Sequence, residues 1–199
     1  MSDPLDKNAI HDAIRQQYAD VACSPGEHFS YETGREGARK LGYNPTWLDR
    51  IPDDIIRFYC GVGNPFELGS LDQGQTILDI GCGAGVDCLI AGLMVGSAGQ
   101  VCGVDLSSEM VEKAKQHTET MELENITIRT GDVENLPFET DRFDVVISNG
   151  VFNLIPDKTS AFAETDRVLK PESRLQFADI VLKEGASRDI PSTPEDWAG

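Results

Sequence analysis

The chain has 199 residues, 40% of them hydrophobic, which is enough for one full-sized core. Its 34 acidic and 17 basic residues give a net charge of -17, which argues against a nucleic acid partner because a phosphate backbone would be repelled. The sequence has neither a run of about 18 apolar residues nor an opening basic segment followed by an apolar one. We therefore expect no membrane span and no signal peptide, and we predict a cytoplasmic protein.

The first 70 residues have the pattern of short helices. Residues 8–22 carry apolar side chains at helical spacing, namely Ile10, Ile14, Tyr18 and Val21. Residues 35–43 and 53–59 predict further helices, separated by breaks that contain Pro or Gly. We interpret residues 1–70 as an N-terminal helical lid or substrate segment.

From residue 71 on, short apolar runs alternate with amphipathic segments. The apolar runs predict strands at 76–80, 100–104, 126–130, 143–148 and 174–182. The amphipathic segments predict helices at about 86–95, 108–121 and 159–169. This alternation is typical of a parallel sheet wound by helices on both faces. We therefore predict that residues 71–199 form an α/β domain with a doubly wound, mostly parallel, Rossmann-like sheet.

Three glycines follow the first predicted strand, in the stretch "TILDIGCGAGVDCLIAG". Gly81, Gly83 and Gly85 lie in the turn from strand to helix, where the backbone can approach a ligand and the helix offers unpaired N–H groups. A dinucleotide-binding fingerprint would place its third glycine where Val86 stands. The loop therefore predicts a site for a polar cofactor without identifying it.

Two acids stand at the ends of the next two predicted strands. Asp105 lies 20 residues beyond Gly85, where its carboxylate can accept hydrogen bonds from both hydroxyls of a ribose. Its alternative role is to cap the helix that follows, but Ser107 can fill that role as well. Asp132 could accept the amine of an adenine lying against Val133, or it could simply form a Gly-Asp turn.

Four segments in order resemble the successive motifs of class I S-adenosylmethionine-dependent methyltransferases: "ILDIGCGAG", "VCGVDLSSEMVEKAK", "GDVENLPFETDRFDVVISN" and "RVLKP". Within that superfamily, "GVGNPF" and "ISNGVFNLIPDKTSAFAETDRVLKP" are most similar to the arsenite methyltransferase group. The resemblance implies S-adenosylmethionine as cofactor and methyl transfer to a small molecule. The residues that it implies at the cofactor are Asp79, Gly81, Gly83, Gly85, Asp105, Leu106, Asp132, Val133 and Asn149. Among these, Asp79 is interpreted as a structural acid that binds loop N–H groups.

In arsenite methyltransferases the acceptor is trivalent arsenic held by cysteine thiolates, which suit a soft, thiophilic element. The chain departs from that pattern, because the group carries cysteines where Gly150 and Val62 stand here. Cys23 and Cys60 are the remaining candidates for an arsenite site, with Asn149 facing the reaction. The alternative is that both are ordinary reduced thiols.

The other cysteines and the histidines carry less information. Cys82, Cys88 and Cys102 are interpreted as reduced packing residues. We expect no metal site, because no pair of histidines has the spacing of metal ligands. His117 is predicted on the exposed side of its helix.

The predicted fifth strand carries two further departures from the family. Glu172 and Ser173 replace a glycine pair ahead of it, and we expect no further strand after it, although the resemblance implies two more. We expect the exposed edge of this strand either to pair with a second copy of the chain or to be covered by the tail, 183–199.

Two other functions stay open. A C- or O-methyltransferase acting on a quinone or another lipid-like acceptor would need an apolar lid but no thiols. A cofactor-binding protein without catalytic activity would fit the shortened sheet and the altered thiols.

Overall fold

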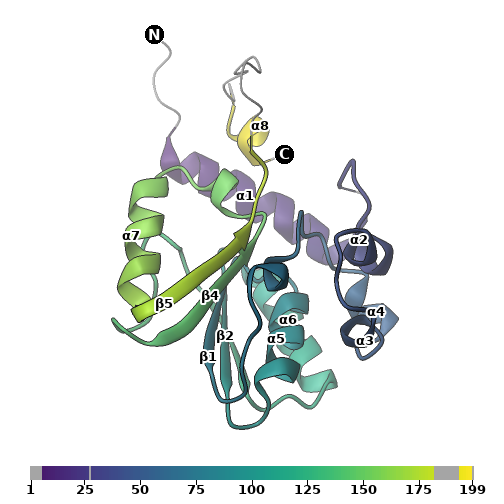
Figure 1. Ribbon diagram of the computed structural model, residues 1–199. Helices are drawn as coiled ribbons and strands as arrows, with labels where there is room; N and C mark the ends of the chain where they lie inside the picture. The colour runs from purple at the N-terminus through teal and green to yellow at the C-terminus, as the bar shows by residue number, and fades with distance from the viewer. Residues whose placement is uncertain (1–5, 27, 182–192, 199) are drawn as a thin grey trace.

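The computed structural model describes residues 6–26, 28–181 and 193–198. Within these residues, five parallel strands form one sheet with the spatial order β3-β2-β1-β4-β5 (Figure 1). The strands are β1 (Thr76–Ile80), β2 (Gln100–Asp105), β3 (Ile126–Thr130), β4 (Phe143–Asn149) and β5 (Leu169–Ala178). The predicted α/β fold with a doubly wound, Rossmann-like parallel sheet is confirmed.

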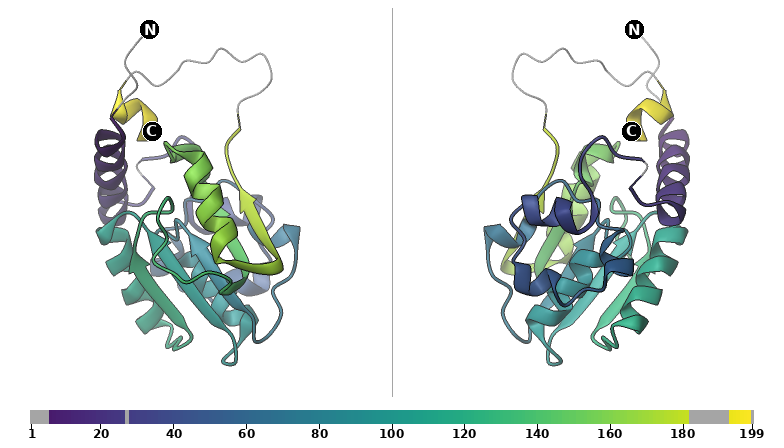
Figure 2. Two further views of the ribbon diagram at one scale, coloured as in Figure 1. Left: turned by 90° about the vertical axis from the view of Figure 1, so that its left-hand side faces the viewer. Right: turned by 90° about the vertical axis from the view of Figure 1, so that its right-hand side faces the viewer.

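Helices cover both faces of this sheet. The α-helices are α1 (Lys7–Cys23), α2 (Gly34–Lys40), α3 (Pro45–Leu48), α4 (Asp53–Ile56), α5 (Val86–Val95), α6 (Ser108–Thr120), α7 (Lys158–Val168) and α8 (Pro194–Ala198), and the 3-10 helices are η1 (Pro65–Leu68) and η2 (Phe152–Leu154). Helices α2 to α4 lie on one side of the molecule and α7 on the other (Figure 2). Among the described residues, no helix combines the length and apolar character needed to cross a membrane.

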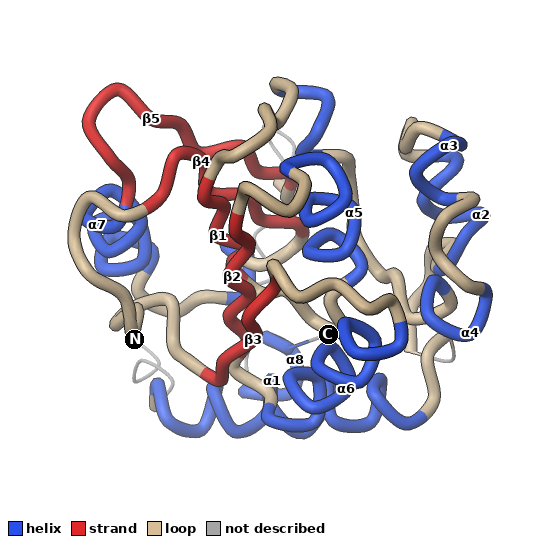
Figure 3. Tube along the Cα trace, turned by 90° about the horizontal axis from the view of Figure 1, so that it is seen from below, coloured by secondary structure: helices blue, strands red, loops and turns tan. Residues whose placement is uncertain are grey.

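The alternation of side chains along the strands gives each face its own core. On β1 and β4, Ile77 and its neighbour Val145 pack toward α5, α6 and the N-terminal helices. Leu78 and its neighbour Val146 pack toward α7 on the opposite face. Figure 3 shows α5 and α7 on the two sides of the strands. Because both faces of β1 and β4 are buried, these two central strands are mostly apolar along their whole length, as buried parallel strands usually are.

Helix α1 lies beyond the carboxyl ends of the strands, where it packs against α6 and α8 (Figure 1). Ile10 and Ile14, from its predicted apolar face, are buried and contact Leu106, Leu154 and Trp197. These contacts place α1 over the edge of the sheet at which parallel strands present their ligand-binding loops.

The described part of the tail, 193–198, does not run along β5, which was one of the two predicted arrangements. Helix α8 packs against α1 instead, and the Trp197 Nε1 donates to the carbonyl oxygen of Leu154 at 2.6 Å. The other tail residues, 183–192 and 199, lie outside the described residues. Among the described strands, β5 pairs with β4 alone, so association of two copies through this edge stays a prediction.

The fifth strand begins and ends earlier than the predicted 174–182. Leu169 already pairs with Phe143, directly after α7, and the register then shifts before Arg174 pairs with Val145. Glu172 lies in this bulge with a φ of 63°, in the left-handed region that favours glycine. Residue 172, one of the two positions at which the resembling family carries glycine, therefore has a backbone conformation that favours glycine.

Replacing Glu172 by Gly should stabilise the fold. A side chain in the left-handed region costs about 1 kcal/mol, and relief of that cost should raise Tm by about 2–4 °C. Thermal unfolding followed by circular dichroism measures this, with Glu172→Ala as the matched control because alanine keeps the Cβ atom. Equal Tm values for the two variants would contradict the strain at this residue.

Candidate functional site

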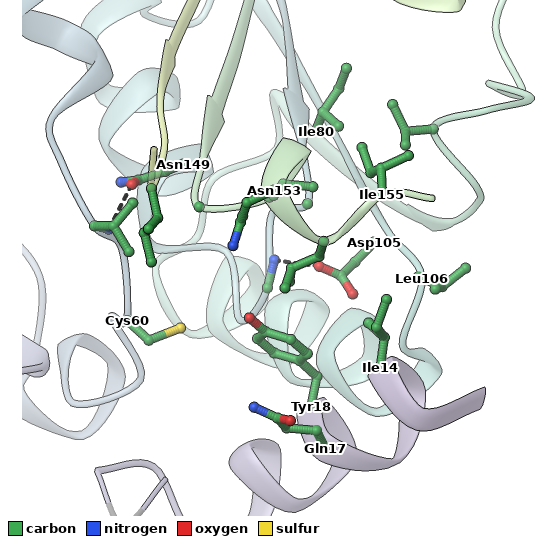
Figure 4. Close-up of a pocket in the computed structure, with 18 of the residues that line it drawn as sticks. Ile14, Gln17, Tyr18, Cys60, Ile80, Asp105, Leu106, Asn149, Asn153 and Ile155 are labelled. Atoms are coloured by element: carbon green, nitrogen blue, oxygen red, sulfur yellow. Dashed lines mark hydrogen bonds between the residues drawn. The ribbon is translucent and has the colours of Figure 1, made fainter. Parts of the chain in front are cut away.

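A cavity of about 230 Å³ lies between α1 and the carboxyl ends of the strands (Figure 4). The sheet contributes the glycine loop and the acids that follow β2 and β3 to its wall, and the N-terminal half contributes Ile14, Tyr18 and Cys60. The segment around Phe29 also lines it, so the cavity is built by both halves of the chain. Enclosure by both halves suits a reaction from which water must be excluded.

The glycine loop passes along the wall of this cavity with all three glycines at positive φ: Gly81 at 68°, Gly83 at 50° and Gly85 at 88°. A Cβ atom at Gly81 would collide with the side chain of Val151, whereas one at Gly83 would meet no atom within 4 Å. The loop therefore turns open backbone toward the cavity, as a loop that contacts a ligand with its main chain requires.

Asp105 holds this loop from the end of β2. Its carboxylate accepts hydrogen bonds from the backbone N–H of Gly83 at 2.8 Å and of Ser107 at 2.9 Å, and it lines the cavity. The alternative role predicted for Asp105, capping the helix α6, is filled by Ser107, whose Oγ accepts from the N–H of Met110 at 3.3 Å. Burial raises the pKa of Asp105, while the backbone hydrogen bonds oppose that rise.

His117 holds the same loop from α6, and the sequence prediction of an exposed side chain is wrong. Its ring is buried, lies 5.2 Å from the ring of Phe58, and donates from Nδ1 to the carbonyl oxygen of Ala84 at 2.8 Å. Burial lowers the pKa of His117. The periodicity of α6 could not reveal this role, because Phe58 comes from a distant segment that covers the polar side of the helix.

Asn149, at the end of β4, lines the cavity but uses its side-chain amide to hold another loop. Its Oδ1 accepts from the N–H of Val62 at 2.9 Å and of Gly63 at 3.1 Å. Its Nδ2 lies 2.9 Å from the carbonyl oxygen of Gly63 and 3.1 Å from Asp87 Oδ2. Burial raises the pKa of Asp87 to about 6, and the Tyr43 hydroxyl donates to Asp87 Oδ1 at 2.7 Å. Asn149 is therefore engaged in positioning the loop of residues 60–63.

The two predicted acceptor thiols are not brought together. Cys60 lines the cavity with its sulfur directed into it (Figure 4), and burial raises its thiol pKa to about 12. Cys23 is the last residue of α1, is exposed, and is not among the residues that line the cavity. In the described structure the cavity thus offers one thiol.

Val62 and Gly150, where the resembling group carries cysteines, lie against each other in the cavity wall. A Cβ atom at Gly150 would be 3.4 Å from both Cγ atoms of Val62. The two positions are therefore neighbours in space. The hydrogen bond between the Val62 N–H and Asn149 Oδ1 joins the same two segments, which lie 87 positions apart in the sequence.

Asp79 is buried beneath the loop, and its hydrogen-bond partner differs from the prediction. The Cys88 thiol donates to Asp79 Oδ2 at 3.2 Å, in place of the expected loop N–H groups. Burial raises the pKa of Asp79 well above its usual value. Cys82, Cys88 and Cys102 are buried, as expected of packing residues.

Asp132, Val133 and Leu106 line the cavity near α1. Asp132 Oδ1 accepts from the backbone N–H of Glu134 at 2.9 Å, so the carboxylate is fixed by its own turn. Its second oxygen, Oδ2, lies 3.7 Å from His11 Nδ1. Asp132 therefore forms a turn and also lines the cavity, so the two roles that the sequence left open for it do not exclude each other.

His11 belongs to a cluster that joins α1 to this turn. Its Nε2 lies 3.8 Å from Glu134 Oε1, and Lys7 forms an ion pair with Glu134. Among the described residues, His11, Asp132 and Glu134 form the one group whose atoms are close enough to share a metal ion. The Lys7 ammonium already supplies a positive charge there, so the cluster is explained as a contact that holds α1 over the cavity.

Comparison with known proteins agrees with this geometry. The family described as methyltransferase domain matches residues 71–198. An arsenite methyltransferase of Halobacterium salinarum is 33% identical over 98% of this chain and 53% of its own length, and a demethylmenaquinone methyltransferase of Staphylococcus epidermidis is 44% identical over 51% of this chain and 42% of its own. The crystal structure of an arsenic(III) S-adenosylmethionine methyltransferase from Chlamydomonas reinhardtii matches with a TM-score of 0.62 and 35% identity, over 67% of this chain and 47% of that one.

The chain spans about half the length of the curated relatives that it matches. The family match itself covers more than half of the chain and all five strands. The chain therefore belongs to the class I S-adenosylmethionine-dependent methyltransferase domain family.

Proposed function

We propose that the chain binds S-adenosylmethionine in this cavity and transfers its methyl group to a small molecule. The observation that carries the proposal is the convergence of the glycine loop, Asp105 and Asp132 on one cavity. The open backbone at Gly83 fits the methionine part of the cofactor, the half-buried carboxylate of Asp105 fits the ribose hydroxyls, and Asp132 with Val133 fits the adenine.

The cofactor supplies a methyl group that is already activated by its bond to a sulfonium. The protein must then mainly align the acceptor and exclude water. Asp105 and His117 fix the glycine loop from two sides, and Asn149 fixes the facing loop of residues 60–63. Helix α1 closes the cavity from above through Ile14 and Tyr18. These roles require no dedicated catalytic triad.

Arsenite is the acceptor that the relatives favour most strongly. The similarity to an arsenite methyltransferase extends over nearly the whole chain, and the family's thiol positions, Val62 and Gly150, are neighbours in the cavity wall. Cys60 supplies a soft ligand at that wall. For Cys23 to supply a second thiol ligand, the C-terminal end of α1 would have to move toward the cavity.

A second candidate is a quinone or another lipid-like acceptor. It is favoured by the apolar character of the wall at the two altered thiol positions, Val62 and Gly150, and by the similarity to a demethylmenaquinone methyltransferase. Such an acceptor would be held by apolar contacts and would make no use of the Cys60 thiol.

Replacing Asp105 by Asn should weaken binding of S-adenosylhomocysteine by about 10- to 100-fold, because a charge-assisted hydrogen bond to the ribose is worth about 1.5–3 kcal/mol. Isothermal titration measures the affinity. Asp144→Asn is the matched control, since Asp144 also accepts a backbone N–H, from Thr76 at 2.8 Å, but at the start of β4. Equal affinities for both variants and the wild type would refute the role of Asp105.

Arsenite should protect Cys60 from alkylation by iodoacetamide, as measured by mass spectrometry of the labelled peptides. Because burial raises the pKa of Cys60 to about 12, we expect it to react far more slowly than the exposed Cys23 even without arsenite. Protection of Cys23 as well would support a two-thiol site. Equal labelling of Cys60 with and without arsenite would shift the proposal to the lipid-like acceptor.

Replacing Val62 by Cys should strengthen arsenite binding by about tenfold, equivalent to about 1.4 kcal/mol, by adding a soft ligand to the cavity wall. Val62 is preferable to Gly150 for this test because the φ of Gly150 is 74°, which would strain a cysteine. Val62→Ser is the matched control, with a hard oxygen in place of sulfur. The same affinity in the Cys and Ser variants would argue that arsenic does not bind at this wall.

A further inference from the structure

Asn153, on η2, carries a side-chain amide that no other group in the described structure satisfies. Its Oδ1 is buried and has no hydrogen-bond partner, which is true of no other buried side-chain nitrogen or oxygen among the described residues. Its backbone is held firmly, because its N–H donates to Asp179 Oδ2 at 3.1 Å and its carbonyl oxygen accepts from Lys158 Nζ at 3.3 Å. The side chain is thus placed by a fixed backbone and not by bonds of its own.

The amide of Asn153 is part of the cavity wall. Figure 4 shows its nitrogen directed into the space that Tyr18 and Cys60 face from the N-terminal half. Asn153 is three residues beyond Gly150 in the chain, and both residues line this cavity together with Val62. This is the acceptor side of the cavity in the proposed function.

The polarity of Asn153 is not explained by the fold. The buried Oδ1 atom of Asn153 costs free energy because it lacks a hydrogen bond, whereas leucine has nearly the same size and would leave no polar atom unpaired. Rotating the amide by 180° would bury the nitrogen in place of the oxygen. One polar atom is therefore buried without a partner in either orientation, while the other faces the cavity. An unpaired donor in a cavity wall is the kind of group that fixes the orientation of a ligand.

We infer that Asn153 recognises an oxygen atom of the methyl acceptor. Its Nδ2 donates a hydrogen bond to a hydroxyl or carbonyl oxygen next to the atom that receives the methyl group. The acceptor therefore belongs to the class of oxygen-bearing molecules, which includes arsenite and hydroquinones, and excludes acceptors that are apolar throughout. This inference rests on the proposed methyl-transfer function and specifies its substrate class.

The test compares Asn153→Leu with the wild type in three binding titrations, each in the presence of saturating S-adenosylhomocysteine. The probes are arsenite, 1,4-naphthohydroquinone and naphthalene, the last of which has no oxygen. We expect at least one oxygen-bearing probe to bind the wild type and to bind the variant about tenfold more weakly, the loss of roughly one hydrogen bond. The affinities for naphthalene and for S-adenosylhomocysteine should not fall.

Thermal unfolding of the unliganded proteins separates recognition from a structural role. Asn153→Leu should melt at or above the wild-type temperature, because it removes an unsatisfied polar group. Asn125→Leu is the matched control, since the Asn125 amide donates to the carbonyl oxygens of Gly92 at 3.1 Å and Gly96 at 3.0 Å, away from the cavity. It should melt lower and leave probe binding unchanged.

If S-adenosylhomocysteine still binds, any one of three results would overturn the inference about Asn153 but not the proposed function. These are unchanged affinity of Asn153→Leu for the oxygen-bearing probes, failure of both such probes to bind the wild type, and a Tm that falls as far as in Asn125→Leu. A wild-type chain that does not bind S-adenosylhomocysteine would overturn the proposed function, and the inference with it.

Discussion

The hydrogen bond from the Gly83 N–H to the Asp105 carboxylate is the interaction on which the site depends. It joins the loop after β1 to the end of β2, so that the two elements that contact the cofactor in the proposed function are fixed relative to each other. The buried ring of His117 holds the neighbouring carbonyl of Ala84 from α6. A loop with three glycines at positive φ has much conformational freedom to lose, and these two contacts restrict it before any ligand arrives.

A second network ties the N-terminal half to the sheet. Asn149 extends from β4 to the backbone of Val62 and Gly63, and Asp87 and Tyr43 complete its surroundings. The N-terminal helices and α5 also share one hydrophobic core, so the two halves are packed as one unit around the cavity. An N-terminal half that is packed into the same core suits the proposed methyl transfer, in which the protein contributes mainly alignment and the exclusion of water.

The sequence predicted those parts of the site that depend on local pattern. Glycines after a strand and acids at strand ends occupy the same edge of a parallel sheet, so Gly83, Asp105 and Asp132 were expected near one another and lie around one cavity. Features that depend on distant contacts were missed. His117 is buried because Phe58 covers it, and Asn149 turns to a loop 87 residues away. The bounds of β5 were misplaced because a bulge at Glu172 interrupts its pairing.

The crystal structure of the chain with S-adenosylhomocysteine tests the central claim most directly. Our account predicts that the ligand occupies the cavity under α1, with its ribose hydroxyls on Asp105, its adenine beside Asp132 and Val133, and its sulfur directed toward the wall formed by Cys60, Val62 and Gly150. Binding at another surface, or a ribose that makes no contact with Asp105, would contradict it.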